Sequence, residues 1–320
     1  MTLYCPIYPF SPNIFADLQN MGCFEFMRTE YVAGTLIAII AGVTGYFVVL
    51  RRSAFVAHAY SEIGFAGAAG AILLGIAPLA GLLLGSILGG VAIALLGRRA
   101  TYRDTQIGIV LAFALGLGLL FISVYRAFAT AAISILFGEI EGVSVSEVYL
   151  TIAACIGILA VIGLVYRPLL FASLDEDVAE AKGMPMELLG TIFMLVVAVA
   201  VSFAVQVTGV LLIFSLMVTP AATAQYVSRT ARSSIAISVV IALLATWVGI
   251  FISFYTNSPV SFFITAIVFF LYIIVRLVDS SMFRRGSRNT GINGGGTFQS
   301  PNAPSSVVGE PLDKEPEVRW

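Results

Sequence analysis

The pair of side chains with the clearest chemistry is His58 and Glu62. His58 is the single histidine of the chain, and it lies four residues before Glu62 in an apolar stretch. Residues four apart in a helix share one face, with Cβ atoms about 5–6 Å apart. An ionisable side chain is costly in lipid and is a functional-site hypothesis by default. Imidazole and carboxylate together suit zinc, manganese or ferrous iron, so we expect a site for such a cation here.

Two side chains are too few to hold such a cation. Further ligands must come from facing helices or from a second subunit, and Tyr60, Ser61 and Gln206 are the candidates in this chain. A structural alternative stays open. In that case Glu62 is neutral and hydrogen-bonded to a neighbouring helix, and His58 is a satisfied packing residue.

Several other kinds of chemistry are excluded by residue type. The lysines are Lys182 and Lys314, and neither follows a glycine, so the chain has no Walker A motif for ATP. One histidine cannot make the HExxH motif of zinc proteases. Cys5, Cys23 and Cys155 form no CxxC pair. Cys5 and Cys23 either pair in an oxidising compartment or stay unpaired. We therefore expect no permanently bound cofactor, and nothing indicates a nucleic acid partner.

A second informative segment is the acidic loop from Leu174 to Pro185, LDEDVAEAKGMP. Its carboxylates disfavour a lipid-surface role, because anionic headgroups would repel them. Ala179, Glu180 and Ala181 precede Gly183, which predicts a short helix that ends at a glycine stop. Such a helix is suited to docking into a groove of a partner, and an ordinary solvated helix is the alternative.

The third segment runs from Gly209 to Ala224 and contains Pro220 within an otherwise helical run. Thr219 is placed to help satisfy the backbone groups that the proline frees. Broken helices are tolerated in membranes where they line a cavity or pack on protein. A pathway helix and a plain kink are equally compatible with this pattern.

The elements that must position these residues are membrane helices. The chain is 59% hydrophobic and 11% charged, with a mean hydropathy of +0.99, whereas soluble domains are about 25% charged. Apolar runs of about 20 residues predict an all-α integral membrane protein, a polytopic bundle of about 8–9 transmembrane helices. The predicted spans are 31–50, 55–75, 79–97, 105–125, 146–166, 188–207, 209–227, 234–254 and 260–277.

The distribution of basic residues predicts the orientation. Arginines and lysines follow alternate spans, while the other side of the membrane holds only Arg28 and Arg126. The positive-inside rule then places the N-terminus outside and the C-terminus in the cytoplasm. The predicted domains are an extracytoplasmic or interfacial segment 1–30, a transmembrane domain 31–278 with a cytoplasmic loop at about 168–187, and a disordered cytoplasmic tail 279–320.

Glycines recur at helix-packing spacing in two neighbouring spans. Small residues four apart let membrane helices approach closely. We expect these ladders to pack within one subunit, with a dimer seam as the alternative. They are Gly64, Gly67 and Gly70 in one span, and Gly81, Gly85 and Gly89 in the next.

Several stretches together resemble the permease subunit of the ATP-binding-cassette importers for zinc and manganese, over about 27–278. They are VVLRRSAFVAHAYSEIGFAG (48–67), ILFGEI (135–140), the LDEDVAEAKGMP loop, VTGVLLIFSLMVTPAATA (207–224) and SFYTNSPVS (253–261). The resemblance implies the fold of a type II importer permease and a homodimer in the cell membrane. It also implies separate ATPase subunits and an extracytoplasmic metal-binding protein. The acidic loop matches the family's coupling helix, which assigns ATPase coupling to Leu174, Ala179, Glu180, Ala181 and Gly183.

One departure from the family pattern concerns the cation site. The family usually has Gly-Asp-x-x-x-His after two arginines, whereas here His58 stands at the Asp position and Glu62 at the His position. Carboxylate and imidazole are both present but exchanged. The exchange supports a cation as cargo and leaves its identity among zinc, manganese and iron open.

Two other functions compete with an ATP-driven importer. A self-sufficient secondary transporter would use His58 and Glu62 as a proton relay coupled to cation flux. Such proteins often contain inverted repeats, and none is convincing here. An intramembrane enzyme is disfavoured, because the chain has one histidine and neither paired aspartates at membrane depth nor a serine-centred motif.

Overall fold

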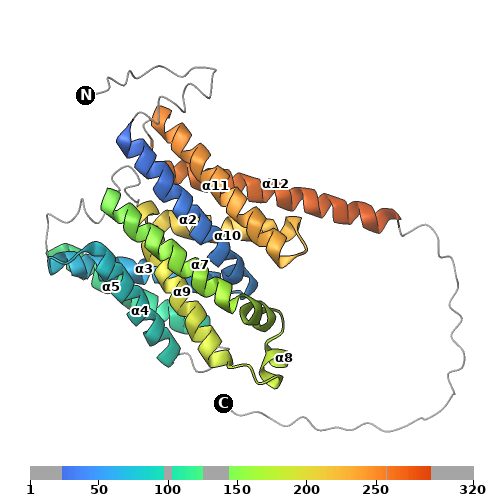
Figure 1. Ribbon diagram of the computed structural model, residues 1–320, viewed down its shortest axis with the longest axis horizontal. Coiled ribbons are helices and arrows are strands. Elements are labelled where there is room, and N and C mark those ends of the chain that lie inside the picture. The colour runs from blue at the N-terminus through green and yellow to red at the C-terminus, as the bar shows by residue number, and fades with distance from the viewer. Residues whose placement is uncertain (1–23, 97–102, 125–143, 257, 290–320) are drawn as a thin grey trace, which may run out of the picture. The chain divides into compact units, whose positions relative to one another are not determined.

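The computed structural model describes residues 24–96, 103–124, 144–256 and 258–289, and every regular element among them is an α-helix (Figure 1). Each predicted span coincides with one of these helices, so the all-α prediction is confirmed. The helices are α2 (Glu25–Leu50), α3 (Ala54–Leu73), α4 (Pro78–Leu96), α5 (Arg103–Val124), α7 (Val145–Leu174), α8 (Glu176–Ala181), α9 (Met186–Thr208), α10 (Val210–Val227), α11 (Ala231–Thr256) and α12 (Val260–Asn289).

Seven of the described helices are long and apolar enough to cross a membrane. Of the other three, α8 has only six residues and α4 is apolar from Pro78 to Leu96. α3 is made less apolar by His58, Glu62 and its many small residues. The helix that carries the expected cation site is thus less apolar than the seven spanning helices. The protein is a multi-pass membrane protein.

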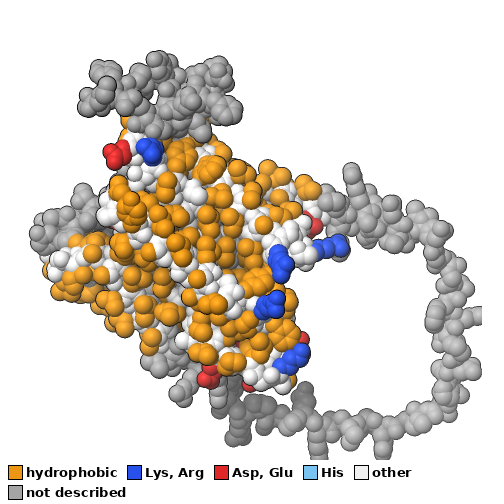
Figure 2. Space-filling model, in the orientation of Figure 1, with side chains coloured by type: hydrophobic (Ala, Val, Ile, Leu, Met, Phe, Trp, Pro, Cys, Tyr) orange, Lys and Arg blue, Asp and Glu red, His pale blue; other side chains and the backbone are white. Residues whose placement is uncertain are grey.

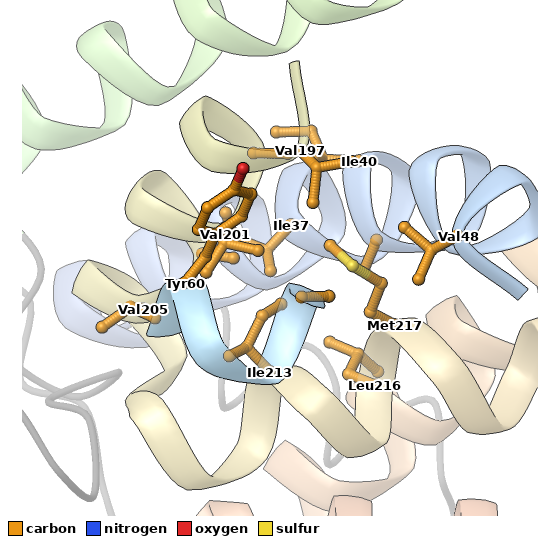
Figure 3. Close-up of a cluster of buried hydrophobic side chains, with 14 of the residues drawn as sticks. Ile37, Ile40, Val48, Tyr60, Val197, Val201, Val205, Ile213, Leu216 and Met217 are labelled. Atoms are coloured by element: carbon orange, nitrogen blue, oxygen red, sulfur yellow. The ribbon is translucent and has the colours of Figure 1, made fainter. Parts of the chain in front are cut away.

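α2 is the central helix of the bundle, and α7, α9, α10 and α11 pack against it. Ile37 and Ile40 of α2 are fully buried. Figure 3 shows them in one apolar cluster with side chains of α3, α9 and α10. Gly45 allows the closest approach, because a Cβ there would overlap the backbone carbonyl of Met217 in α10.

α3 and α4 form a tightly packed hairpin. A left-handed Gly75, with φ of 70°, ends α3, and α4 begins at Pro78, a residue favoured at the first position of a helix. A Cβ on Gly67 would overlap the backbone of Gly81, and a Cβ on Gly81 would overlap that of Gly67. The two glycine ladders therefore face each other within one chain.

The connector between α2 and α3 is short and fully hydrogen-bonded. Its amides at Arg52 and Ser53 donate to the carbonyls of Val49 and Val48, 3.0 and 2.8 Å away. Arg52 has φ of 53° and is the only non-glycine residue with a positive φ in the described part of the chain. An arginine therefore occupies the position at which helices commonly end on glycine.

Two segment boundaries differ from the sequence prediction. α7 continues through Pro168 to Leu174, so it includes the start of the predicted loop 168–187. Leu169 and Ala172, just past the proline, are buried, and their burial stabilises the extra turns. α12 extends to Asn289. Residues 1–23 and 290–320 lie outside the described ranges, so the N-terminal segment, Cys5, Cys23 and the tail remain predictions.

The surface of the described helices is largely apolar. On the face drawn in Figure 2, hydrophobic side chains predominate. Leu164 of α7 is 83% exposed and Phe113 of α5 is 69% exposed. Exposed apolar surface on this scale marks an interaction or membrane surface, which agrees with a lipid environment.

Candidate functional site

His58 and Glu62 lie on α3, where both side chains are partly buried. They are close enough to interact electrostatically, as the four-residue spacing predicts. The Nδ1 atom of His58 is buried and has no hydrogen-bond partner among the described residues. A buried polar atom without a partner is costly. This nitrogen is therefore the expected place for a bound cation or a transferred proton.

An aromatic side chain closes one side of this pair. The ring of Phe214, from α10, stands edge-on to the His58 ring with centroids 5.2 Å apart. Phe55, one turn earlier on α3, lies 6.4 Å from the same ring. Aromatic contacts of this kind restrict the orientation of the imidazole. No sequence pattern distinguishes Phe214, although it lies within the segment from Gly209 to Ala224 that contains Pro220.

The three further ligand candidates are engaged elsewhere. Tyr60 is 2% exposed, and its hydroxyl lies against α4, where a Cβ on Gly90 would be 2.7 Å away. The Ser61 hydroxyl donates to the carbonyl of His58 at 2.7 Å. The Gln206 side-chain amide donates to Glu147 Oε1 at 2.9 Å. None of these groups is directed at the His58–Glu62 pair as a ligand.

The described residues of one chain therefore offer an incomplete cation site. Across the described ranges, no group of three or more His, Cys, Asp or Glu side chains is placed to hold a metal ion. Transition metals take four or more ligands in proteins. His58 and Glu62 can supply two of them, and the remaining ligands would come from water, from another chain or from outside the described ranges.

Serine hydroxyl groups of α4 and α9 hydrogen-bond at the turn of α3 that carries the pair. Ser86 of α4 donates to the Tyr60 carbonyl at 3.1 Å. Ser202 of α9 lies 3.2 Å from the Ser86 hydroxyl, and both serines are fully buried. Sequence reasoning missed these two residues, because a serine in an apolar run carries no pattern that distinguishes a buried bridge from a packing residue.

The predicted short helix in the acidic loop is confirmed as α8. Asp175 caps its start by accepting a hydrogen bond from the Val178 amide at 3.0 Å. The amides of Gly183 and Met184 donate to the carbonyls of Glu180 and Ala179, at 2.8 and 3.2 Å. Gly183 is left-handed, with φ of 77°. This is the glycine-stopped end that the sequence predicts.

The proposed coupling residues divide into an anchor and an exposed face. Ala179 is fully buried and fastens α8 to the bundle, whereas Leu174 is 69% exposed and Val178 is 42% exposed. Glu180 and Ala181 are exposed as well. Exposed apolar side chains rimmed by carboxylates are a surface suited to a protein partner.

α10 is continuous through Pro220, from Val210 to Val227. The hydroxyl of Thr223 donates to the carbonyl of Thr219 at 2.7 Å, whereas the carbonyl that loses its helical donor to Pro220 is that of Leu216. The break lies instead at Gly209, whose φ of 82° and ψ of 162° are accessible essentially only to glycine. α10 is therefore an unbroken helix that places Phe214 against His58.

Comparison with known proteins agrees with this architecture. The family model described as the ABC 3 transport family matches residues 23–279. The chain belongs to the ABC 3 transport family. The resemblance inferred from the sequence motifs is thereby confirmed, and the chain is a permease-type transporter component of this family and no enzyme.

Individual relatives of this family member come from several bacteria. The manganese import system permease protein ScaB of Streptococcus parasanguinis is 31% identical over 79% of this chain and 91% of that protein. The manganese transport system membrane protein MntC of Halalkalibacterium halodurans is 27% identical over 75% and 83% of the two chains. The solved structure of PsaBC from Streptococcus pneumoniae in complex with Fab is 28% identical, with a TM-score of 0.75 over 82% of this chain and 95% of that one.

Proposed function

We propose that this chain forms the translocation pathway of an ATP-driven importer for a divalent transition metal. The observation that carries the proposal is the pair of metal-ligating side chains, His58 and Glu62, on one face of a membrane helix in a member of the ABC 3 transport family. Manganese is the favoured cargo, because relatives over most of the chain are named for manganese import. Zinc and iron are the other candidates, since both accept imidazole and carboxylate.

The pathway would be built by two copies of the chain. One copy supplies two ligands, and a second copy related by two-fold symmetry would double the set to a number typical of transition metals. Phe214 would shield one side of each imidazole from water. Metal would arrive from an extracytoplasmic binding protein and be held transiently before release to the cytoplasm.

ATP hydrolysis would take place on separate subunits, since the chain has no Walker A motif. α8 offers the docking surface, with Leu174 and Val178 exposed and the carboxylates around them. In the proposed topology the N-terminus lies outside, and α8 and the C-terminus lie in the cytoplasm, as the positive-inside rule predicts. The proton-coupled alternative is not favoured, because the named relatives are permeases of import systems.

The direct test is metal uptake into proteoliposomes that contain the permease with its ATPase and binding protein. Manganese, zinc and iron are compared with and without ATP. We expect uptake that requires ATP, with manganese taken up fastest. Uptake driven by a proton gradient without the ATPase would instead establish the secondary transporter.

Substitution at the end of α8 tests the docking proposal. Gly183→Val should abolish ATP-driven uptake, because valine disfavours φ of 77° and the α8 surface would shift. Gly75→Val is the matched control: Gly75 has φ of 70°, and, as at Gly183, nothing lies within 4 Å of an added Cβ. Both variants carry the same backbone strain of about 1–2 kcal/mol. Equal loss of uptake in the two would argue against docking by α8.

A further inference from the structure

Ser202 of α9 joins this helix to α4 and, through Ser86, to α3. Its Oγ atom lies 2.8 Å from the carbonyl of Ala198 in its own helix, 3.2 Å from the carbonyl of Leu82 and 3.2 Å from Ser86 Oγ in α4. Ser86 in turn donates to the carbonyl of Tyr60 in α3 at 3.1 Å. A hydroxyl has one proton to donate and can also accept. When the Ser202 proton is directed at Ser86, the Ser202 hydroxyl, the Ser86 hydroxyl and the Tyr60 carbonyl form one continuous hydrogen-bonded chain.

This chain ends within the turn of α3 that carries the proposed cation ligands. The Tyr60 carbonyl lies between His58 and Glu62 in sequence, so a displacement of that peptide moves both side chains. The contact between Ser86 and α3 is tightly packed, since a Cβ on Gly64 would be 2.8 Å from Ser86 Oγ. Interiors packed this closely transmit displacement instead of absorbing it.

The other end of this hydrogen-bonded chain, Ser202, lies on α9, which follows the proposed docking helix α8 in sequence. This helix begins five residues after α8 and is unbroken from Met186 to Thr208. Ser202 lies about 24 Å along the helix axis from its start, at 1.5 Å per residue. α9 also touches the connector before α3, because the Arg51 guanidinium lies 5.1 Å from the centroid of the Phe193 ring. A movement of α8 therefore reaches α3 at two points.

We propose that Ser202 and Ser86 are positioning residues that pass movement of α8 and α9 to the His58–Glu62 turn of α3. The inference rests on the proposed function, because it assigns the hydrogen-bonded chain to the coupling of ATP hydrolysis with cation release. A contiguous network of this kind carries coupling only if both ends bias it. The test therefore measures coupling as well as stability.

The experiment uses the full transport complex in proteoliposomes and measures manganese ions transported per ATP hydrolysed. Ser202→Ala and Ser86→Ala should each lower this ratio about fivefold, which corresponds to one hydrogen bond of ordinary net strength. The double variant should lower the ratio no further than either single variant, because the two serines act in the same hydrogen bond. Ser238→Ala is the matched control, since Ser238 is also fully buried but its hydroxyl has no hydrogen-bond partner within the described helices.

The inference is overturned if the ratio stays at the wild-type value while the melting temperature falls, because the serines would then only hold the bundle together. A fivefold loss in Ser238→Ala would overturn it as well. If Ser202→Ala does not fold, Ser86→Ala decides the question alone. Failure of the proposed function has a different signature, in which the wild-type complex itself shows no ATP-dependent manganese uptake.

Discussion

Glu62→Gln should abolish ATP-driven manganese uptake while the protein still inserts into the membrane and binds its ATPase. The amide has nearly the shape of the carboxylate but lacks its charge, and manganese prefers anionic oxygen ligands. Loss of an outer partner of a ligand costs about 10–100-fold in metal affinity, so loss of the ligand charge itself should cost more. Because Glu62 is only partly buried on α3, the neutral side chain should be accommodated without unfolding.

The measurement is initial-rate uptake of manganese together with the melting temperature in detergent. Glu25→Gln serves as the matched control. Glu25 is exposed in the first turn of α2, so this substitution removes the same charge away from the site. Uptake by the control should equal that of the wild type. Wild-type uptake in Glu62→Gln would remove Glu62 from the cation site and favour the structural alternative, in which this side chain only packs.

Gly67→Ala should destabilise the protein more than any other single-methyl addition on α3. The added Cβ would overlap the carbonyl of Gly81 and lie 2.9 Å from Gly85 Cα, and both are backbone atoms that cannot rotate away. Overpacking of this kind costs about 1–3 kcal/mol. α3 would separate from α4, and the site helix would lose the contact that fixes its position.

Thermal unfolding in detergent, followed by circular dichroism, measures this effect. Gly157→Ala is the control: Gly157 lies on α7 with nothing within 4 Å of an added Cβ, so its melting temperature should stay the same or rise slightly with helix propensity. If Gly67→Ala melted at the wild-type temperature, the close approach of the α3–α4 hairpin would be contradicted.

Local features of this fold were predictable from the sequence. Apolar runs between charges predicted each long helix of the described ranges, because lipid requires each span to satisfy its own backbone hydrogen bonds. The i,i+4 spacing placed His58 and Glu62 on one face of α3. The glycine stop predicted α8, and Gly183 has the left-handed backbone that such a stop requires.

Contacts between helices were not predictable in the same way. Ser202 meets Ser86 across a separation of 116 residues, and Phe214 meets His58 from α10. Packing in a membrane depends on close fit of small groups, which leaves no periodic signal in one sequence. The end of α7 was misjudged for a related reason, since Pro168 signals a helix end locally while burial of Leu169 continues the helix.

The connector at Arg52 limits how the pathway can open. Its backbone bonds at Arg52 and Ser53 close the end of α2 directly onto the start of α3, and no spare residues remain between the helices. Sliding of α3 along its axis would break these hydrogen bonds in the link of three residues, 51–53. In the proposed transporter, release of the cation would then come from a tilt of α3 about this connector, with the largest displacement at its far end near Gly75.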